Sequence, residues 1–178
     1  KTVSGVTRLA TPEAFGIYLA APYAFRLHQK YPDLRLELTP ESQRVQLANR
    51  DADLAVMLNR PPQGPIIARK LVDYRIGLYA SRRYLDEQGD ICDAASLPRH
   101  PFASYIDERI DIPELRYLRE VSEDAASIFR STSIAAQHEA VAGGLGVRML
   151  KVFAVETDSR LVRILPDEVE ITRTYWLA

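Results

Sequence analysis

Strand-like and helix-like apolar patterns alternate along this chain, and that alternation most constrains what it can fold into. Residues 3–10 and 34–38 have strand patterns, whereas apolar residues recur at helical spacing between Ala14 and Phe25. Residues 54–58 are continuously apolar, as is typical of a parallel strand that is covered on both faces. Strands separated by helices predict an α/β fold with mostly parallel sheets.

The rest of the chain continues the alternation. Pro22 falls inside the first helical pattern, so we expect a kink or a restart of the helix there. The stretch 107–124 is ambiguous. We expect further strands at 66–71, 74–80, 102–106, 126–130, 144–150, 161–165 and 172–178, and helices at 81–86, 133–143 and 151–157.

Polar residues stand at the junctions between strands and helices. Thr11, Pro12 and Glu13 follow the first strand, in the order expected of an N-cap, a first helical residue and a first-turn acid. Thr39 to Ser42 repeat this order after the second strand, and Ser131 to Ser133 stand before a later helix. Each group alone is explained by helix capping. Together, at the carboxyl ends of parallel strands, they predict a small-molecule site built from hydroxyls and backbone N–H groups.

Composition and charge exclude several classes of protein. The 178 residues suffice for one large domain or two small lobes. With 23 basic and 24 acidic residues, the chain carries no electrostatic footprint for nucleic acid or a membrane surface. No apolar run is long enough to span a bilayer, and no signal-peptide pattern is visible. Cys92 is the single cysteine, which fits a reducing compartment.

No catalytic or metal-binding motif is evident. The chain has neither a G-x-S-x-G nucleophile elbow nor a Walker loop, and Gly143–Gly146 follows a helix, which is typical of a C-cap. His28, His100 and His138 are far apart and lack partners at metal-ligand spacing, so we expect surface or packing roles. The sequence therefore predicts no enzyme, no metal site and no cofactor.

The order of several segments resembles a known family. These segments are "ATPEAFGIYLAAPYAFRLHQKYPDLRLEL", "DADLAVML", "LYASRRYL", "AVAGGLGVRML" and "RLVRILPDE". Over nearly the whole chain they resemble the effector-binding domain of LysR-type transcriptional regulators. The resemblance implies two Rossmann-like α/β lobes joined by two crossover strands, similar to type 2 periplasmic binding proteins, with an inducer in the cleft between the lobes.

The resemblance also implies lobe boundaries. Lobe I would comprise residues 1–78 with 152–178, and lobe II residues 79–151. The crossovers would lie near Tyr79–Ala80 and Met149–Lys151.

The family's inducer cleft maps onto the junctions described above. By position, its lining residues are Thr11, Pro12, Glu13, Ala14, Thr39, Ser42, Ser131, Thr132 and Ser133. Arg130 is the nearest candidate to hold a carboxylate. If Glu13 points into the cleft, an anionic inducer is disfavoured and a cationic or zwitterionic one is preferred. If it points outward, it only serves the helix dipole, and we favour this second alternative.

The resemblance further implies what such a domain works with. We expect a small-molecule inducer, a homodimer or homotetramer, a cytoplasmic location and no membrane partner. The stretches 14–28 and 133–143 are the natural oligomerisation faces. DNA would be contacted only through an N-terminal winged helix-turn-helix, which this sequence lacks, so we expect a fragment of a longer regulator. The alternative is a solute-binding protein of a transport system, which shares the fold.

Overall fold

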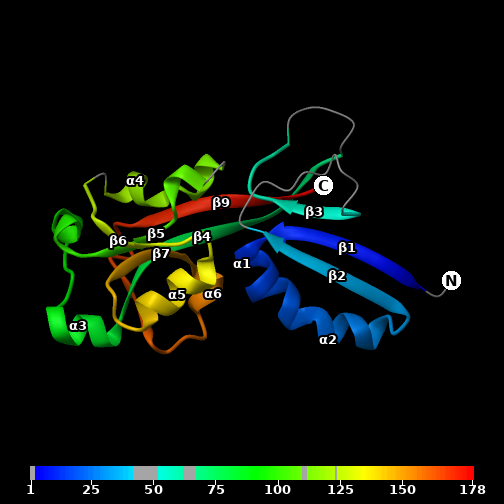
Figure 1. The fold of residues 1–178 in the computed structure, drawn as a ribbon, viewed down its shortest axis with the longest axis horizontal. Coiled ribbons are helices and arrows are strands. Elements are labelled where there is room, and N and C mark those ends of the chain that lie inside the picture. The colour runs from blue at the N-terminus through cyan, green and yellow to red at the C-terminus, as the bar shows by residue number, and fades with distance from the viewer. Residues whose placement is uncertain (1–2, 42–51, 62–66, 110–111, 123) are drawn as a thin grey trace. The chain divides into compact units, whose positions relative to one another are not determined.

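The structure is a computed structural model that describes residues 3–41, 52–61, 67–109, 112–122 and 124–178 (Figure 1). The chain forms two compact units. Unit 1 comprises Lys1–Asp73 together with Thr174–Ala178, and unit 2 comprises Tyr74–Arg173. Each unit is described by itself below.

Unit 1 is built on parallel strands, as the alternating pattern predicts. Strand β1 (Gly5–Pro12) pairs in parallel with β2 (Leu34–Glu41) on one side and with β3 (Leu54–Met57) on the other. The last strand of the chain, β9 (Glu170–Leu177), adds an antiparallel neighbour to β3. The continuous apolar run at β3 supplies the buried Ala55 and Val56.

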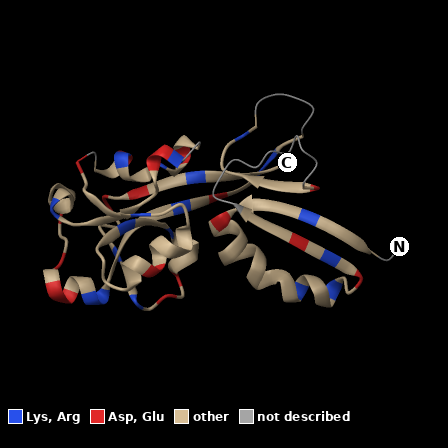
Figure 2. Cartoon of the chain, viewed as in Figure 1, with Lys and Arg blue, Asp and Glu red and all other residues tan. Residues whose placement is uncertain are grey.

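A broken helix connects β1 to β2. It consists of α1 (Glu13–Phe15), a π-helical turn η1 (Gly16–Ala20) and α2 (Ala21–Lys30). Pro22 stands in the first turn of α2, where its missing N–H leaves no helical bond unmade, so the expected restart is confirmed. No residue of α2 is buried, and its charged residues gather in its C-terminal half (Figure 2).

Unit 2 holds the larger group of paired strands. The long strand β4 (Arg69–Ser81) enters it and pairs antiparallel with β7 (Val147–Lys151) and with β8 (Leu161–Ile164). Beyond β7, strand β5 (Phe102–Ser104) pairs in parallel with both β7 and β6 (Ser127–Arg130). Parallel pairing therefore recurs in both units, and the strands that pass between units pair antiparallel.

Helices cover both faces of the strands of unit 2 (Figure 1). Helix α4 (Tyr117–Val121) lies on one side, and α5 (Ile134–Ala142) and α6 (Val152–Val155) lie on the other. Helix α3 (Arg82–Gln88) follows β4 directly, capped by the Ser81 hydroxyl, which accepts from the Tyr84 N–H at 3.1 Å. The ambiguous stretch 107–124 forms short turns, η4 (Asp107–Arg109) and η5 (Pro113–Leu115), before α4. A further turn, η3 (Ala94–Arg99), precedes β5.

The core of unit 2 is made of large apolar side chains from several elements. Leu150 of β7 and Val141 of α5 are almost completely buried in one cluster with Tyr79 of β4.

The glycine-rich segment after α5 is tightly constrained. Gly146 has φ +149°, and a Cβ there would lie 2.1 Å from the carbonyl oxygen of Pro101.

The observed boundaries differ from the expected lobes. The chain passes between units at Asp73–Tyr74 and again at Arg173–Thr174, not near Tyr79–Ala80 and Met149–Lys151. Residues 152–173, expected in lobe I, belong to unit 2 instead. The physical reason is the antiparallel pairing of β8 with Leu78–Ser81 of β4, which sequence patterns do not reveal. Among the described residues, no helix is long and apolar enough to cross a membrane.

Candidate functional site

Unit 2 contains a polar pocket with a cavity volume of about 220 Å³. The pocket is formed by strands β5, β6 and β7, by η4, η5 and α4 with the loops beside them, and by one residue of α5. Its charged lining comprises four arginines and one aspartate. The lining residues are Ala103, Ser104, Tyr105, Asp107, Leu115, Arg116, Tyr117, Leu118, Arg119, Ser122, Ala125, Ser127, Arg130, Gln137, Arg148 and Met149.

The most deeply placed cation of this pocket is Arg148 of β7, which is only 2% exposed. Its guanidinium lies 5.3 Å from the ring centroid of Tyr105, and its Nε donates to the Met149 carbonyl at 3.2 Å. A guanidinium carries its N–H groups in a planar fork. A planar anion such as a carboxylate matches the geometry of those N–H groups.

A second buried cation lies on the same strand. Lys151 is 2% exposed, and its Nζ donates to the Tyr117 hydroxyl at 3.4 Å. The same ammonium lies 5.6 Å from the Tyr117 ring centroid and 5.8 Å from that of Tyr74. Burial, followed by the neighbouring Tyr74 and Tyr105, raises the pKa of Tyr117, so its hydroxyl stays neutral at pH 7. Strand β7 therefore adds positive charge behind the pocket.

The more exposed arginines of the pocket are held by acids of η4. Arg119 donates to Asp107 at 3.0 Å, and Arg130 donates to Glu108 at 3.4 Å. A backbone hydrogen bond within Glu108, followed by the charge of Arg130, lowers the pKa of Glu108. These exposed pairs contribute little stability, so an incoming anion can exchange with their carboxylates at low cost.

Gln137 of α5 is a polar residue of the lining that is fully buried. Its Nε2 donates to the Ser131 carbonyl at 2.6 Å. Since a carbonyl can only accept, this bond fixes which end of the amide is the nitrogen. The other atom, Oε1, is buried and accepts no hydrogen bond from any described residue.

The structure places the predicted residues of unit 1 on neighbouring strands. Thr11 was expected to cap a helix, but this is wrong: it is the penultimate residue of β1, and the cap position is Pro12. Thr11 is fully buried, opposite Pro40 of β2 in the parallel register. Its hydroxyl has no hydrogen bond among the described residues.

The other predicted residues of unit 1 follow from this register. Glu13 and Ala14 begin α1 as expected. Thr39 lies within β2, beside Ala10 of β1, and is exposed, so it does not start a helix. The strand continues to Glu41 because β1 offers it a full-length parallel partner. Ser42 lies outside the described residues.

The predicted residues of unit 2 follow directly after β6. Arg130 ends that strand and lines the pocket. Ser133 caps α5 as expected, accepting from the Ala136 N–H at 3.3 Å, and the Ser131 hydroxyl accepts from the Ser133 N–H at 3.1 Å. Thr132 lies between these two caps. The structure thus places Thr11 to Ala14 and Thr39 in unit 1, and Arg130 to Ser133 in unit 2.

Sequence reasoning missed Arg148, Gln137 and Tyr117. Arg148 could have been found, because it is a charged residue inside the apolar run 144–150, where a strand was expected. Gln137 and Tyr117 carried no comparable signal, because their burial depends on elements distant in sequence.

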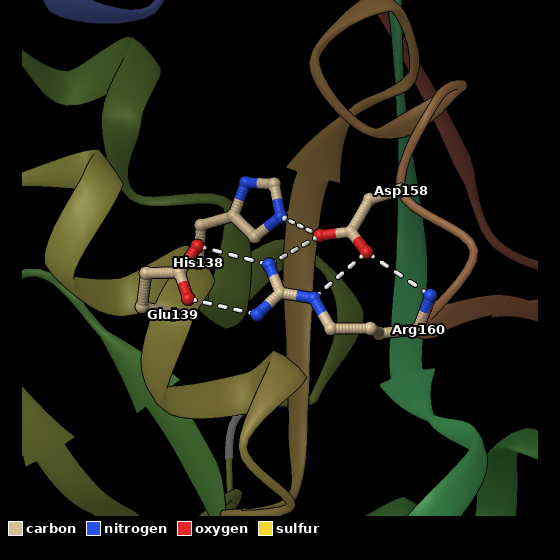
Figure 3. A network of polar contacts seen from close by, with 4 residues as sticks. All are labelled: His138, Glu139, Asp158 and Arg160. Carbon is tan, nitrogen blue, oxygen red and sulfur yellow. Dashed lines mark hydrogen bonds and ion pairs between the residues drawn. The ribbon is translucent and has the colours of Figure 1, made fainter.

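A separate polar network joins α5 to the turn before β8 (Figure 3). His138 Nε2 lies 2.8 Å from Asp158, and Arg160 contacts both Asp158 and Glu139, at 2.7 and 2.9 Å. Hydrogen bonds from Arg160, followed by that from His138, hold the pKa of Asp158 well below its usual range. The expected packing role of His138 is therefore confirmed.

The other two histidines fit their expected surface or packing roles. His28 is exposed, and His100 Nδ1 lies 2.8 Å from the Tyr84 hydroxyl. Cys92 is exposed in a loop. Within the described part of the chain, no group of three or more His, Cys, Asp or Glu side chains is arranged to hold a metal ion.

The sequence matches the family described as "LysR substrate binding domain" over residues 1–178. The chain belongs to this family. Solved structures agree with the fold that the family implies. The regulatory domain of CrgA, a LysR-type transcriptional regulator from Neisseria meningitidis, superposes with a TM-score of 0.85 at 21% identity, over 98% of this chain and 88% of that one. Full-length AphB from Vibrio cholerae gives 0.78 at 22% identity, over 98% of this chain and 61% of that one.

Curated relatives are named as transcription regulators. An HTH-type transcriptional regulator of Xanthomonas campestris is 30% identical over 97 residues, which is 54% of this chain and 26% of that protein. The Mau operon transcriptional activator of Paracoccus denitrificans is 26% identical over 165 residues, which is 92% of this chain and 49% of that protein. The LysR substrate-binding domain described here thus spans at most about half of these relatives. Their names favour a regulator over the transport alternative.

Proposed function

We propose that this chain is the effector-sensing and oligomerisation part of a LysR-type transcriptional regulator. Its ligand is a small anion, and the pocket of unit 2 holds that anion. The observation that carries this proposal is the lining of four arginines and one aspartate, with Arg148 almost fully buried among them. A cavity of about 220 Å³ suits a ligand smaller than drug size.

The residues expected from the family complete the proposal. Thr11, Pro12, Glu13 and Ala14, with Thr39 and Ser42, are proposed ligand contacts from the first lobe. Arg130 and Ser131 to Ser133 are proposed contacts from the second. Two observations support this set: Arg130 lines the pocket, and the buried Thr11 hydroxyl accepts and donates no hydrogen bond among described residues.

The mechanism is a shift between conformations and involves no chemical step. Bound effector favours one arrangement of the regulator over another, in proportion to its difference in affinity for the two. The full-length protein would contact DNA through a helix-turn-helix domain and would act in the cytoplasm. We propose a homodimer or homotetramer, because α2 exposes Tyr23 and Phe25 to solvent at 57% and 68%.

Thermal unfolding with a ligand panel tests the anion site. We expect small carboxylates to raise the melting temperature of the chain and matched amines to leave it unchanged. At 100 times its dissociation constant, a ligand adds about 2.7 kcal/mol of stability. Arg148→Met should abolish the shift. Arg83→Gln, an exposed change on α3 outside the pocket lining, should retain it. Stabilisation by amines alone would refute the anion site.

A further inference from the structure

Gln137 presents a hydrogen-bond acceptor that the protein itself does not use. Its Nε2 donates to the Ser131 carbonyl at 2.6 Å, so the amide cannot turn over without losing that bond. Its Oε1 is buried and accepts no hydrogen bond from any residue that the structure describes. A buried acceptor without a donor is unfavourable, so a donor supplied by a ligand is strongly preferred there.

The charges around the pocket decide which kind of donor fits. The lining carries Arg116, Arg119, Arg130 and Arg148, and its one acid, Asp107, already accepts from Arg119. The ammonium of Lys151 lies behind the lining, at the Tyr117 hydroxyl. A cationic amine is repelled by these groups, whereas a neutral hydroxyl is not. The charges therefore favour a neutral donor, and a hydroxyl is the simplest neutral donor that a small acid can carry.

We infer that the effector of this domain is a small hydroxylated carboxylate, and that Gln137 distinguishes it from the same acid without a hydroxyl. This inference rests on the proposed anion site, because the carboxylate is assigned to Arg148. Gln137 and Arg148 line one cavity, so one small molecule can meet both. Gln137 is a specificity-determining residue and Arg148 an affinity-determining one.

The expected discrimination follows from the cost of an unused acceptor. A site built to bind a hydroxyl rejects the analogue without it, because its own polar group then stays unpaired. A purely apolar pocket, by contrast, hardly distinguishes an acid that carries a hydroxyl from one that does not. We expect the hydroxylated acid of a matched pair to bind at least about tenfold more tightly.

Paired ligands test the inference on the 178-residue chain. Isothermal titration compares 3-hydroxybenzoate with benzoate and lactate with propionate, two pairs of different size. The same titrations are repeated with Gln137→Met, which keeps the length and apolar stem but removes the acceptor together with the Nε2 donor to Ser131. Circular dichroism checks that each variant unfolds cooperatively.

The supporting result has two parts. In the unchanged chain, the hydroxylated member of at least one pair binds about tenfold more tightly. In Gln137→Met, that ratio falls to within about twofold, and affinity for the plain acid is retained. A merely structural role for Gln137 would weaken both acids equally and leave the ratio unchanged.

The opposing results separate the two proposals. Equal binding of both members in the unchanged chain overturns the hydroxyl inference and leaves the anion site standing, as when a water molecule already donates to Oε1. A preference that persists in Gln137→Met overturns the role of Gln137. No binding of any acid by a cooperatively folded chain overturns the anion site, and the inference with it.

Discussion

The two units differ in the size of the side chains that they bury. Both cover strands that include parallel pairs with helices, but unit 2 buries large side chains such as Phe102, Leu78 and Leu150 almost completely. Apart from Tyr175 of β9, which is fully buried, the buried residues described in unit 1 are mostly small, such as Ala10 and Ala55. Unit 2 thus completes its own core and has room for a polar pocket.

Unit 1 instead leaves an apolar groove between its helix and its sheet. The groove has a volume of about 540 Å³ and is lined by Leu19, Tyr23 and Leu27 from the helix side, with Leu9 and Leu36 from the sheet. The comparison teaches that unit 2 completes an apolar core beside a polar pocket, whereas unit 1 keeps apolar surface available. Its single tryptophan, Trp176 of β9, allows unit 1 to be followed separately by fluorescence.

The largest expected difference concerns two glycines. In Gly146→Ala, the new Cβ would meet the Pro101 carbonyl oxygen at 2.1 Å, a backbone atom that cannot move aside. We expect a loss of about 3 kcal/mol or more in the free energy of unfolding of unit 2. In Gly16→Ala, the Cβ would lie 2.7 Å from Pro40 Cβ and Thr11 Oγ1, and we expect a loss of about 1–2 kcal/mol in unit 1. Urea denaturation followed by circular dichroism and by Trp176 fluorescence measures both. Similar losses for the two variants would contradict the claim of a tighter unit 2.

Leucine truncations compare the two cores directly. Leu150→Ala empties a position that is 1% exposed, and we expect a loss of about 3 kcal/mol. Leu27→Ala removes a half-buried side chain beside the open groove of unit 1, and we expect a loss of about 1 kcal/mol. The midpoints of urea unfolding provide the measurement. If Leu27→Ala costs as much as Leu150→Ala, the groove is closed in solution, for instance by a second copy, and dilution should then reduce the cost.

The polar network of Figure 3 allows a buried contact and an exposed contact of unit 2 to be compared. Asp158→Asn weakens contacts to both His138 and Arg160, and we expect a loss of about 1–2 kcal/mol in the free energy of unfolding. Glu139→Gln, on the exposed arm of the same network, should cost less than about 0.5 kcal/mol. Thermal unfolding at pH 7 measures both. Equal effects would mean that burial of Asp158 does not strengthen its contacts.

The smallest expected effect is a dependence on pH. Arg160 and then His138 lower the pKa of Asp158, so its stabilising contribution is fully present above the ordinary aspartate pKa of about 3.9. It is lost as the pH falls through the lowered pKa. Between pH 5 and pH 3, we expect Asp158 to account for less than about 1 kcal/mol of lost stability in unit 2. Urea unfolding at both pH values should show a shallower decline for Asp158→Asn than for the unchanged chain. An equal loss of stability in Asp158→Asn and in the unchanged chain would refute the role of Asp158 in this pH dependence.

Much of the fold was predictable because its helices and strands follow local sequence patterns. The helix at 134–142 lies within the predicted range, with Ser133 as its cap, and the strands at 54–57 and 161–164 match closely. The candidate site was predictable only in part. Arg130 and the serine caps were found because they stand at a junction, whereas Arg148 and Gln137 were not, since their burial is created by distant elements.

The sequence by itself determined the family, the alternating strands and helices, and the polar helix start at Ser131–Ser133. These features depend on periodicity, capping and segment order, which act over a few residues or in linear sequence. The tertiary structure alone decided that β8 joins unit 2, that Thr11 lies within a strand, and that Gln137 and Arg148 line one cavity. Strand pairing and burial depend on contacts between residues far apart in sequence, and no local pattern records them.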